Sequence, residues 1–351
     1  MASAAPDSIR IRLTISGQVQ GVGFRPFIYR IALDNHLHGF VLNAPEGVII
    51  ELQGASRDVT GFERDLQDKL PPLADIVTLE RDELPPDAGQ EAAFVIRKST
   101  SGRGHHVLIS PDTATCDDCL ADMADRDNRR FGYPFTNCTN CGPRYTITRS
   151  IPYDRPFTSM ACFPLCPDCE AEYNDPLDRR FHAQPNACPV CGPECWFTDK
   201  EGRELARGRN AIARLAEALA FGSICAIKGL GGYHLACEAC NHEAVMELRS
   251  RKKRWDKPLA VMVPDLESAH RLAHISAEEA EQLLSRERPI VLVRPRLPRP
   301  LSPAVAPDTD FIGIMLPYTP LHHQLFKHVA DFPLSTGIPA LVMTSGNKSS
   351  E

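Results

Sequence analysis

The sequence lacks any apolar run that approaches the roughly 18 residues a membrane-spanning helix needs. Its first residues also lack the basic start and apolar core of a secretory signal, so we expect no leader and no membrane association. Positive charge is not in excess, because 39 Lys and Arg face 45 Asp and Glu for a formal net charge of −6. A protein dominated by non-specific contacts with nucleic acid is expected to be basic, so we expect no nucleic-acid partner.

Cysteine, by contrast, is abundant, with 13 residues in a chain of 351. Disulfides are rare in reducing compartments, so Cys-x-x-Cys pairs in a chain without a secretory signal favour metal binding. The odd count also fits poorly with a framework in which every cysteine forms a disulfide. We therefore expect a cytoplasmic protein, with roughly two or three domains for this length.

Eight cysteines form a duplicated unit whose two copies lie 50 residues apart. The first copy contributes Cys116, Cys119, Cys138 and Cys141, and the second Cys166, Cys169, Cys188 and Cys191. Four thiolates complete a tetrahedral zinc site, so the repeat predicts two structural Zn²⁺ ions. The spacing leaves the pairing open: each ion could take one copy, or the outer pairs could share one ion and the inner pairs the other.

A small segment with few apolar runs gains much of its folding free energy from metal. Zinc modules often bind nucleic acid, but acidic residues are interleaved with the arginines here and no recognition helix is evident. We therefore expect a structural platform between the neighbouring domains.

Residues 8–98 predict strands and helices in the order βαββαβ, which is the ferredoxin-like pattern of an antiparallel sheet covered by helices on one face. We expect strands at Ile9–Ile15, Phe40–Ala44, Val48–Leu52, Ile76–Leu84 and Phe94–Lys98, and helices from Pro26 onward and over Val59–Leu70. The turn at 45–47 joins the second and third strands.

A glycine-rich loop, Ser16–Arg25, separates the first strand from the first helix, and Pro26 is expected at the first helical position. Backbone N–H groups and the positive end of a helix suit an anion at such a junction. Arg25 adds a potentially bidentate contact to the same oxygens. From these residues alone, a plain tight turn is equally open.

The loop, together with Gly39–Asn43 and Gly47, resembles the acylphosphatase family over its whole length. The resemblance implies that Arg25 binds the phosphate and that Asn43 orients the attacking water. It also implies a phosphate cradle made of Gln20, Gly21, Val22, Gly23 and Phe24. An acyl phosphate is already activated, so charge stabilisation and a positioned water suffice for hydrolysis. For Asn43 the alternative is a strand-end amide that satisfies the following turn.

Residues 205–351 predict alternating helices and buried strands, as in an α/β or α+β domain. Helices are expected over Asn210–Phe221, His242–Arg251, Asp265–Ala273, Ala277–Ser285 and Pro320–Val329. Strands are expected at Ser223–Lys228, Leu259–Val263, Pro289–Arg294 and Ala340–Thr344.

Six basic residues fall within residues 249–257, a density that favours either a solvated helix end or a polyphosphate partner. Together with a glycine turn and a Ser/Asn loop, this segment resembles the YrdC/Sua5 family. The resemblance implies binding of ATP with Mg²⁺, formation of a carbamoyl-type adenylate and release of pyrophosphate. The residues it implicates are Lys228, Tyr233, His234, Lys252, Arg254, Lys257, Ser345 and Asn347.

The three modules in this order resemble the HypF family, the carbamoyltransferases of [NiFe]-hydrogenase maturation. Phe131–Pro143, Lys228–Leu235 and Met315–His322 carry the resemblance. It implies that carbamoyl phosphate is hydrolysed, that the carbamate is adenylated with ATP, and that the carbamoyl group passes to the C-terminal cysteine of the partner protein HypE as precursor of the cyanide ligand.

We therefore expect a multidomain α+β chain: an acylphosphatase-like domain at 8–98, a linker at 99–115, the zinc module at 116–200 and a YrdC-like nucleotide-binding domain at 205–351. The chain stops directly after the Ser/Asn loop, where the family continues, so we expect a fragment without the final transfer step. The alternative is a zinc-containing, nucleic-acid-binding or tRNA-modifying protein of the YrdC type. The acylphosphatase-like module and the negative charge count against that alternative.

Overall fold

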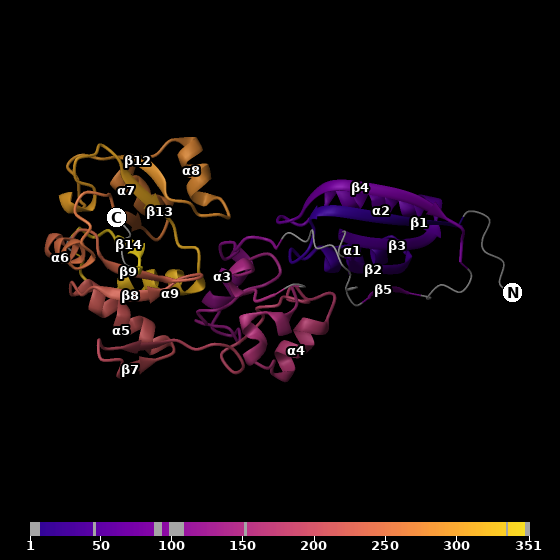
Figure 1. Cartoon of the computed structure of the whole chain (residues 1–351), viewed down its shortest axis with the longest axis horizontal. Coiled ribbons are helices and arrows are strands. Elements are labelled where there is room, and N and C mark those ends of the chain that lie inside the picture. The colour runs from indigo at the N-terminus through magenta and orange to yellow at the C-terminus, as the bar shows by residue number, and fades with distance from the viewer. Residues whose placement is uncertain are drawn as a thin grey trace. The chain divides into compact units, whose positions relative to one another are not determined.

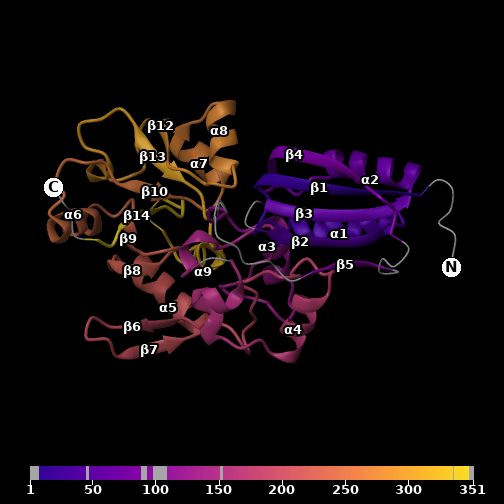
Figure 2. The same cartoon turned by 45° about the vertical axis from the view of Figure 1, so that its right-hand side comes forward.

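The computed structural model describes residues 8–44, 47–87, 93–97, 109–150, 153–334 and 336–347. The chain divides into two compact units, Met1–Pro111 with Asn137–Ala187 and Asp112–Thr136 with Cys188–Glu351. Figures 1 and 2 label the elements of both units from two directions. Part of the predicted turn at 45–47, the last residue of the strand predicted to end at Lys98, and most of the predicted linker lie outside the described residues.

The first unit contains a five-stranded sheet in the order β4-β1-β3-β2-β5. Its strands are β1 (Ser8–Gln18), β2 (His38–Ala44), β3 (Gly47–Ala55), β4 (Asp75–Leu84) and β5 (Phe94–Ile96). The two helices are α1 (Phe24–Asp34) and α2 (Ser56–Asp68). The first four strands pair antiparallel in the predicted ferredoxin-like arrangement, and β5 extends it by pairing parallel to β2.

Alternation along β1 explains why this segment is a strand with one buried face. Ile11, Leu13 and Ile15 are fully buried and belong to the cluster that also contains apolar residues of α1 and α2. Residues two apart in a strand share a face, so the helices cover the face of the sheet that these side chains form. Helix α1 begins at Phe24, two residues earlier than expected, and Pro26 remains in the first turn where its missing N–H is tolerated.

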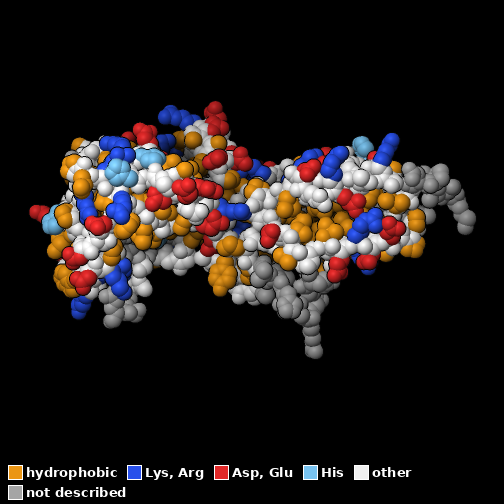
Figure 3. All heavy atoms as spheres, turned by 90° about the horizontal axis from the view of Figure 1, so that it is seen from above, with side chains coloured by type: hydrophobic (Ala, Val, Ile, Leu, Met, Phe, Trp, Pro, Cys, Tyr) orange, Lys and Arg blue, Asp and Glu red, His pale blue; other side chains and the backbone are white. Residues whose placement is uncertain are grey.

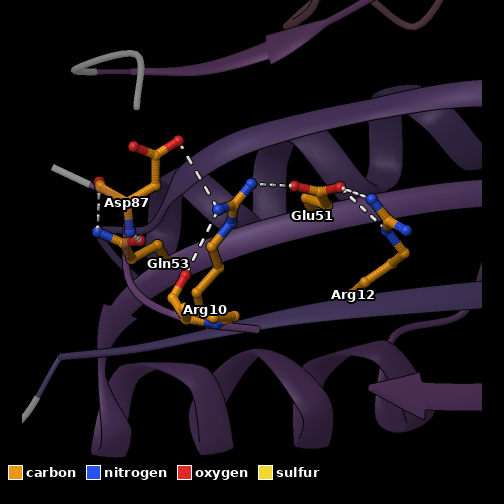
Figure 4. A network of polar contacts seen from close by, with 6 residues as sticks. Arg10, Arg12, Glu51, Gln53 and Asp87 are labelled. Atoms are coloured by element: carbon orange, nitrogen blue, oxygen red, sulfur yellow. Dashed lines mark hydrogen bonds and ion pairs between the residues drawn. The ribbon is translucent and has the colours of Figure 1, made fainter. Parts of the chain in front are cut away.

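The intervening residues of β1 point to the opposite face, where they hold a buried carboxylate (Figure 4). Arg10 Nη2 donates to Glu51 Oε2 at 2.7 Å, and Arg12 Nε donates to Glu51 Oε1 at 2.9 Å. Burial alone would raise the pKa of Glu51, but the hydrogen bonds from Arg12 and Arg10 outweigh it and the pKa lies below its usual value. The strand pair β1–β3 is therefore charged on one face and apolar on the other.

The duplicated segment has little regular structure beyond one short helix in each repeat. These helices are α3 (Asp117–Ala124) and α4 (Pro167–Asn174), and each begins one residue after the first cysteine of its repeat. The backbone repeats as well, because the N–H of Gly132 donates to Met123 and that of His182 to Tyr173, both at 3.0 Å. The duplication predicted from the cysteines thus extends to the local fold.

The second unit contains a seven-stranded mixed sheet in the order β11-β12-β13-β10-β14-β9-β8. Its strands are β8 (Cys225–Lys228), β9 (Tyr233–Glu238), β10 (Ala260–Met262), β11 (Ala273–His274), β12 (Val291–Pro295), β13 (Ile312–Met315) and β14 (Leu341–Ser345). The helices are α5 (Arg209–Ala220), α6 (His242–Lys252), α7 (Leu266–Leu272), α8 (Ala277–Leu284) and α9 (Pro320–Val329), and a hairpin of β6 (Trp196–Thr198) and β7 (Glu204–Arg207) precedes them.

Two apolar clusters hold this sheet. One contains residues of α6, α7 and α8, and the other contains residues of α5 and α9. The predicted helices and strands are present to within a few residues, whereas β9, β11 and β13 were not predicted as strands. No helix among the described residues combines the length and apolar character needed to cross a bilayer. Acidic and basic side chains are intermixed on the face that Figure 3 shows.

Candidate functional site

The eight cysteines of the repeat form two groups of four. One group contains Cys116, Cys119, Cys138 and Cys141, and the other Cys166, Cys169, Cys188 and Cys191. The sulfur atoms of each group lie within 4.8 Å of one another. Each group therefore belongs to one repeat, which is the first of the two pairings that the spacing left open.

The sulfur spacing fits tetrahedral zinc. Cys138 Sγ lies 3.9 Å from Cys141 Sγ, and Cys188 Sγ lies 3.8 Å from Cys191 Sγ. Four thiolates at the usual Zn–S distance of about 2.3 Å are separated by about 3.8 Å. Backbone N–H groups of Asn140 and Val190 approach Cys138 Sγ and Cys188 Sγ at 3.4 Å, as is common around metal-bound thiolates. These residues fit two structural Zn²⁺ ions.

Two glycines shape the loop between β1 and α1. Gly21 and Gly23 have φ angles of 73° and 74°, a left-handed conformation that glycine adopts without steric penalty. A Cβ on Gly21 would lie 3.2 Å from the ring of Tyr153, and one on Gly23 would lie 3.2 Å from Thr139 Oγ1. The backbone conformation therefore favours glycine at both positions, and the neighbouring side chains leave little room for a Cβ.

The other loop residues contribute in different ways. The side chains of Val22 and Phe24 are buried in the core, so these residues can offer an anion only their backbone N–H groups. Gln20 Nε2 donates to the carbonyls of Ala44 and Gly47 at 3.2 and 3.0 Å. The Gln20 side chain thus holds the loop against the end of β2 and the start of β3.

Asn43 lies near the end of β2, opposite Val48 of β3. The residue is 9% exposed, and its Oδ1 atom is buried without a hydrogen-bond partner among the described residues. The carbonyls at the neighbouring turn are satisfied by Gln20 instead. A buried amide oxygen without a partner has a capacity to accept a hydrogen bond that the fold does not use.

Arg25, the second residue of α1, lines a pocket of the first unit that is partly open to solvent. Burial lowers the pKa of Arg25, while the nearby Asp154 and Tyr173 act in the opposite direction. The loop side of the pocket consists of Val19, Gly21, Gly23, Phe24, Arg25 and Pro26. The other side consists of Thr139, Arg144, Tyr153, Phe181, His182, Ala183 and Gln184 from the cysteine-rich segment.

The residues on the second side of this pocket were not predicted from the sequence. Tyr153, His182 and Gln184 were not among the predicted site residues, because the segment was interpreted as a platform alone. One signal was present: at the repeat offset of 50 residues, His182 and Gln184 replace Gly132 and Pro134. The two copies of the repeat thus differ at residues that line the pocket.

Arg144 is another residue that sequence reasoning missed. Its side chain is almost fully buried, and Nε donates to the carbonyl of Gly21 at 2.9 Å. Nη2 donates to the carbonyls of Cys138 and Thr139 at 2.9 and 2.8 Å, and Nη1 donates to that of Pro143 at 2.8 Å. One guanidinium therefore joins the glycine-rich loop to the backbone around Cys138 and Cys141.

Six of the eight predicted nucleotide-binding residues meet at the ends of β8, β9 and β14. They are Lys228, Tyr233, His234, Lys252, Ser345 and Asn347. Ser345 pairs with His234 between β14 and β9, and Lys228 pairs with Tyr233 between β8 and β9. Lys252 reaches the same place from the end of α6, where Nζ donates to the carbonyls of Ser345 and Asn347 at 2.7 and 2.9 Å.

Arg254 and Lys257 come from the loop between α6 and β10. Burial and then the positive charge of Arg254 lower the pKa of Lys252, so Arg254 lies near the strand-end cluster. Arg249, which was not singled out as a site residue, is buried and donates to the backbone carbonyls of Arg254 and Lys257 at 2.7 and 3.1 Å. Arg249 therefore holds the backbone of the loop between α6 and β10 in place.

An aromatic group is joined to this cluster through His234. His234 Nε2 and the Tyr318 hydroxyl are 2.6 Å apart, and the ring of His322 lies 4.6 Å from that of Tyr318. His322 is fully buried, and neither ring nitrogen has a hydrogen-bond partner among the described residues. Burial lowers the pKa of His322 to about 3, with His234 and His323 adding to the effect.

Three family models match the chain. The acylphosphatase model matches residues 11–96, and the HypF finger model matches residues 115–148 and 165–198. The Sua5/YciO/YrdC model, described as telomere recombination, matches residues 217–351.

Among curated proteins, carbamoyltransferase HypF2 of Cupriavidus necator is 47% identical over 99% of this chain and 44% of its own length. Carbamoyltransferase HypF of Rhizobium leguminosarum bv. viciae is 48% identical over 97% of this chain and 42% of its own length. A crystal structure of full-length HypF in the phosphate- and nucleotide-bound form has a TM-score of 0.88 and 42% identity, covering 100% of this chain and 44% of that one. HypF of T. kodakarensis has a TM-score of 0.85 and 43% identity, covering 97% of this chain and 42% of that one. The chain thus spans less than half the length of these relatives.

Proposed function

Because this chain belongs to the HypF carbamoyltransferase family, with acylphosphatase, HypF finger and Sua5/YrdC domains, we propose that it catalyses the first two steps of carbamoyl transfer. In the first step carbamoyl phosphate reacts with water to give carbamate and phosphate. In the second step a carbamate oxygen attacks the α-phosphorus of ATP, giving carbamoyl adenylate and pyrophosphate. Both steps are anion chemistry and need positive charge at fixed positions.

The observation that carries the first step is the position of Arg25 beside the glycine-rich loop. Arg25 lines the same pocket as Gly21 and Gly23, whose left-handed backbone shapes the loop at the start of α1. Backbone N–H groups and the helix terminus attract the phosphate, and Arg25 binds two of its oxygens. The relative that was solved with phosphate bound supports an anion site in this family.

Asn43 is the residue we assign to the attacking water. Its buried Oδ1 can accept a hydrogen bond that no described residue donates. A water held by Asn43 would be directed toward the phosphorus, and carbamate would leave with the bridging oxygen. Hydrolysis of an activated anhydride needs this positioning more than it needs a protein nucleophile.

For the second step we assign the triphosphate to the basic cluster at the ends of β8, β9 and β14. Lys228, Lys252, Arg254 and Lys257 neutralise the phosphates, and Mg²⁺ bound with ATP would supply further charge stabilisation. Tyr233, His234, Ser345 and Asn347 complete the assigned nucleotide site. The strand pairing and hydrogen bonds that bring six of these residues together support this assignment, as does the relative solved with nucleotide bound.

The last step is a proposal for the whole protein, since the relatives are more than twice as long as the part spanned here. We propose that the carbamoyl group passes to the thiolate of the C-terminal cysteine of HypE, with release of AMP. Cytoplasm is the compartment we propose, because thiolate ligands of zinc persist where thiols stay reduced.

The test is phosphate release from carbamoyl phosphate by the purified chain. Arg25→Ala should abolish release while the protein stays folded, whereas Arg64→Ala on the exposed side of α2 should leave it unchanged. Hydrolysis at the parental rate by the Arg25 variant would refute the assignment of the site. Pyrophosphate release from ATP that depends on carbamoyl phosphate, measured on the longer protein, tests the second step.

A further inference from the structure

His182 has a left-handed backbone conformation. Its φ angle is 51°, in the left-handed region that residues with a Cβ rarely adopt. The equivalent residue of the first repeat is Gly132, with φ 64°, and the two N–H groups make equivalent hydrogen bonds to Tyr173 and Met123. One repeat thus uses glycine where the geometry favours glycine, and the other keeps a histidine against that preference. This difference between the two repeats points to a function for the side chain.

The neighbours of His182 fix its ring. Tyr173 stacks on the imidazole with 5.0 Å between ring centroids and 18° between planes, and Phe181 lies 4.4 Å away. Gln184 braces the same group, because Nε2 donates to the carbonyl of His182 at 2.8 Å and Oε1 accepts from the Tyr173 hydroxyl at 2.7 Å. A ring held by stacking and by a braced backbone loses little freedom when it binds a ligand.

These supports belong to the second repeat alone. Tyr173 and Gln184 correspond to Met123 and Pro134 of the first repeat, which can neither stack in this way nor make these hydrogen bonds. Zinc binding cannot account for the difference, since both repeats hold four cysteines in the same way. The second repeat has therefore acquired a side-chain arrangement that the metal site does not need.

His182 lines the pocket that contains Arg25 and the glycine-rich loop. Burial and the positive charge of Arg25 lower the pKa of His182 to about 4, so the imidazole is neutral near pH 7. A neutral imidazole has one N–H donor and one nitrogen acceptor. The pocket thus combines a cation and a loop for a phosphate with an uncharged group that can both donate and accept.

We propose that His182 binds the carbamoyl end of carbamoyl phosphate and makes the site selective for it over acyl phosphates without an amide nitrogen. This inference rests on the proposed hydrolysis of carbamoyl phosphate. The cysteine-rich segment is then part of the substrate site, in addition to its structural role.

The expected selectivity follows from the NH₂ group of the carbamoyl moiety. Carbamoyl phosphate and acetyl phosphate have nearly the same shape, but the first carries an NH₂ group where the second carries a methyl group. The acceptor nitrogen of His182 pairs with the NH₂ group and is left without a partner opposite a methyl group. Sites built to hydrogen-bond a substrate N–H reject the analogue that lacks it, because a buried polar group then stays unpaired.

The experiment compares kcat/KM for carbamoyl phosphate and for acetyl phosphate in the parent chain and in three variants. His182→Gly copies the first repeat and keeps the backbone conformation. His182→Asn tolerates the same conformation and retains a donor and an acceptor. His36→Gly is the matched control, since His36 is an exposed histidine of the same unit with φ 54°.

In His182→Gly the preference for carbamoyl phosphate should fall about tenfold, the effect of one lost hydrogen bond. His182→Asn should retain part of the preference, and His36→Gly should retain all of it. Zinc content should match the parent, because His182 belongs to neither cysteine group. An unchanged preference in His182→Gly, or an equal fall for both substrates, would overturn this inference while the proposed hydrolysis stands. Failure of the parent chain to hydrolyse carbamoyl phosphate would refute both.

Discussion

Arg144 Nε donates a hydrogen bond of 2.9 Å to the carbonyl of Gly21, although the two residues are 123 positions apart in the sequence. The same guanidinium donates to the carbonyl of Cys138. A structural change at this cysteine can therefore reach the glycine-rich loop through a single side chain. Arg144 is a positioning residue in this arrangement. Its side chain contacts the backbone carbonyl of Gly21 and affects the pocket through the glycine-rich loop.

Replacing Arg144 with lysine tests this connection. A lysine ammonium cannot reproduce the planar fork of donors that serves four carbonyls at once. We expect kcat/KM for carbamoyl phosphate to fall on the order of tenfold to a hundredfold, because small displacements of a binding loop are amplified in the rate. We also expect the chain to be less stable by about 2 kcal/mol, since buried carbonyls lose charged donors.

The matched control for this variant is Arg149→Lys, an exposed arginine of the same segment. It should leave both the rate and the melting temperature unchanged. A rate equal to that of the parent in Arg144→Lys would show that the loop keeps its shape without this guanidinium.

The metal content of the two cysteine groups can be measured directly. The parent chain should contain about two zinc ions, as two closed four-thiolate sites require. Cys138→Ser should reduce this to about one and should lower the thermal stability, because metal supplies much of the folding free energy of such a segment. Elemental analysis of the purified proteins gives the ratio.

Cys162→Ser provides the comparison, since Cys162 is exposed and belongs to neither group. Its zinc content should equal that of the parent. Two ions retained in Cys138→Ser, or one ion in the parent, would contradict the assignment of two four-cysteine sites.

The low pKa of His322 predicts that the stability of the second unit decreases in acid. Its pKa is about 3 in the folded chain, far below the value of about 6.5 in an unfolded one. As the pH falls below about 6.5, the unfolded state therefore binds a proton that the folded state does not, and stability decreases. Between pH 7 and pH 5 this residue alone should contribute a loss of about 2 kcal/mol.

His322→Leu should weaken this pH dependence, because leucine takes no proton in either state. His274→Leu, at an exposed histidine of β11, should leave it as in the parent. Melting temperatures between pH 5 and pH 8 give the comparison. Equal pH dependence in the parent and in His322→Leu would show that His322 can be protonated in the folded protein.

Local patterns accounted for much of the fold. The alternation of Ile11, Leu13 and Ile15 with polar residues predicted β1, and the glycines that follow predicted a loop before α1. Strand β11 was missed, because two residues carry no periodic signal, and β13 was missed because Gly313 interrupts its apolar run. Residues that hold others in place, such as Arg249, were missed for a different reason. Their role depends on backbone carbonyls that become neighbours only after folding.

The sequence by itself determined that the chain carries two sets of four cysteines, a glycine-rich loop followed by Arg25, and a basic segment before Pro258. Each of these features consists of particular residue types a few positions apart, so it can be recognised from the local sequence. Tertiary structure decided that each set of cysteines forms its own group and that His182 and Arg144 lie at the pocket of Arg25. No local rule links positions more than a hundred residues apart, because their proximity results from packing of the whole unit. The cysteine-rich segment was therefore predicted as a zinc platform, and only the folded unit placed it at the candidate active site.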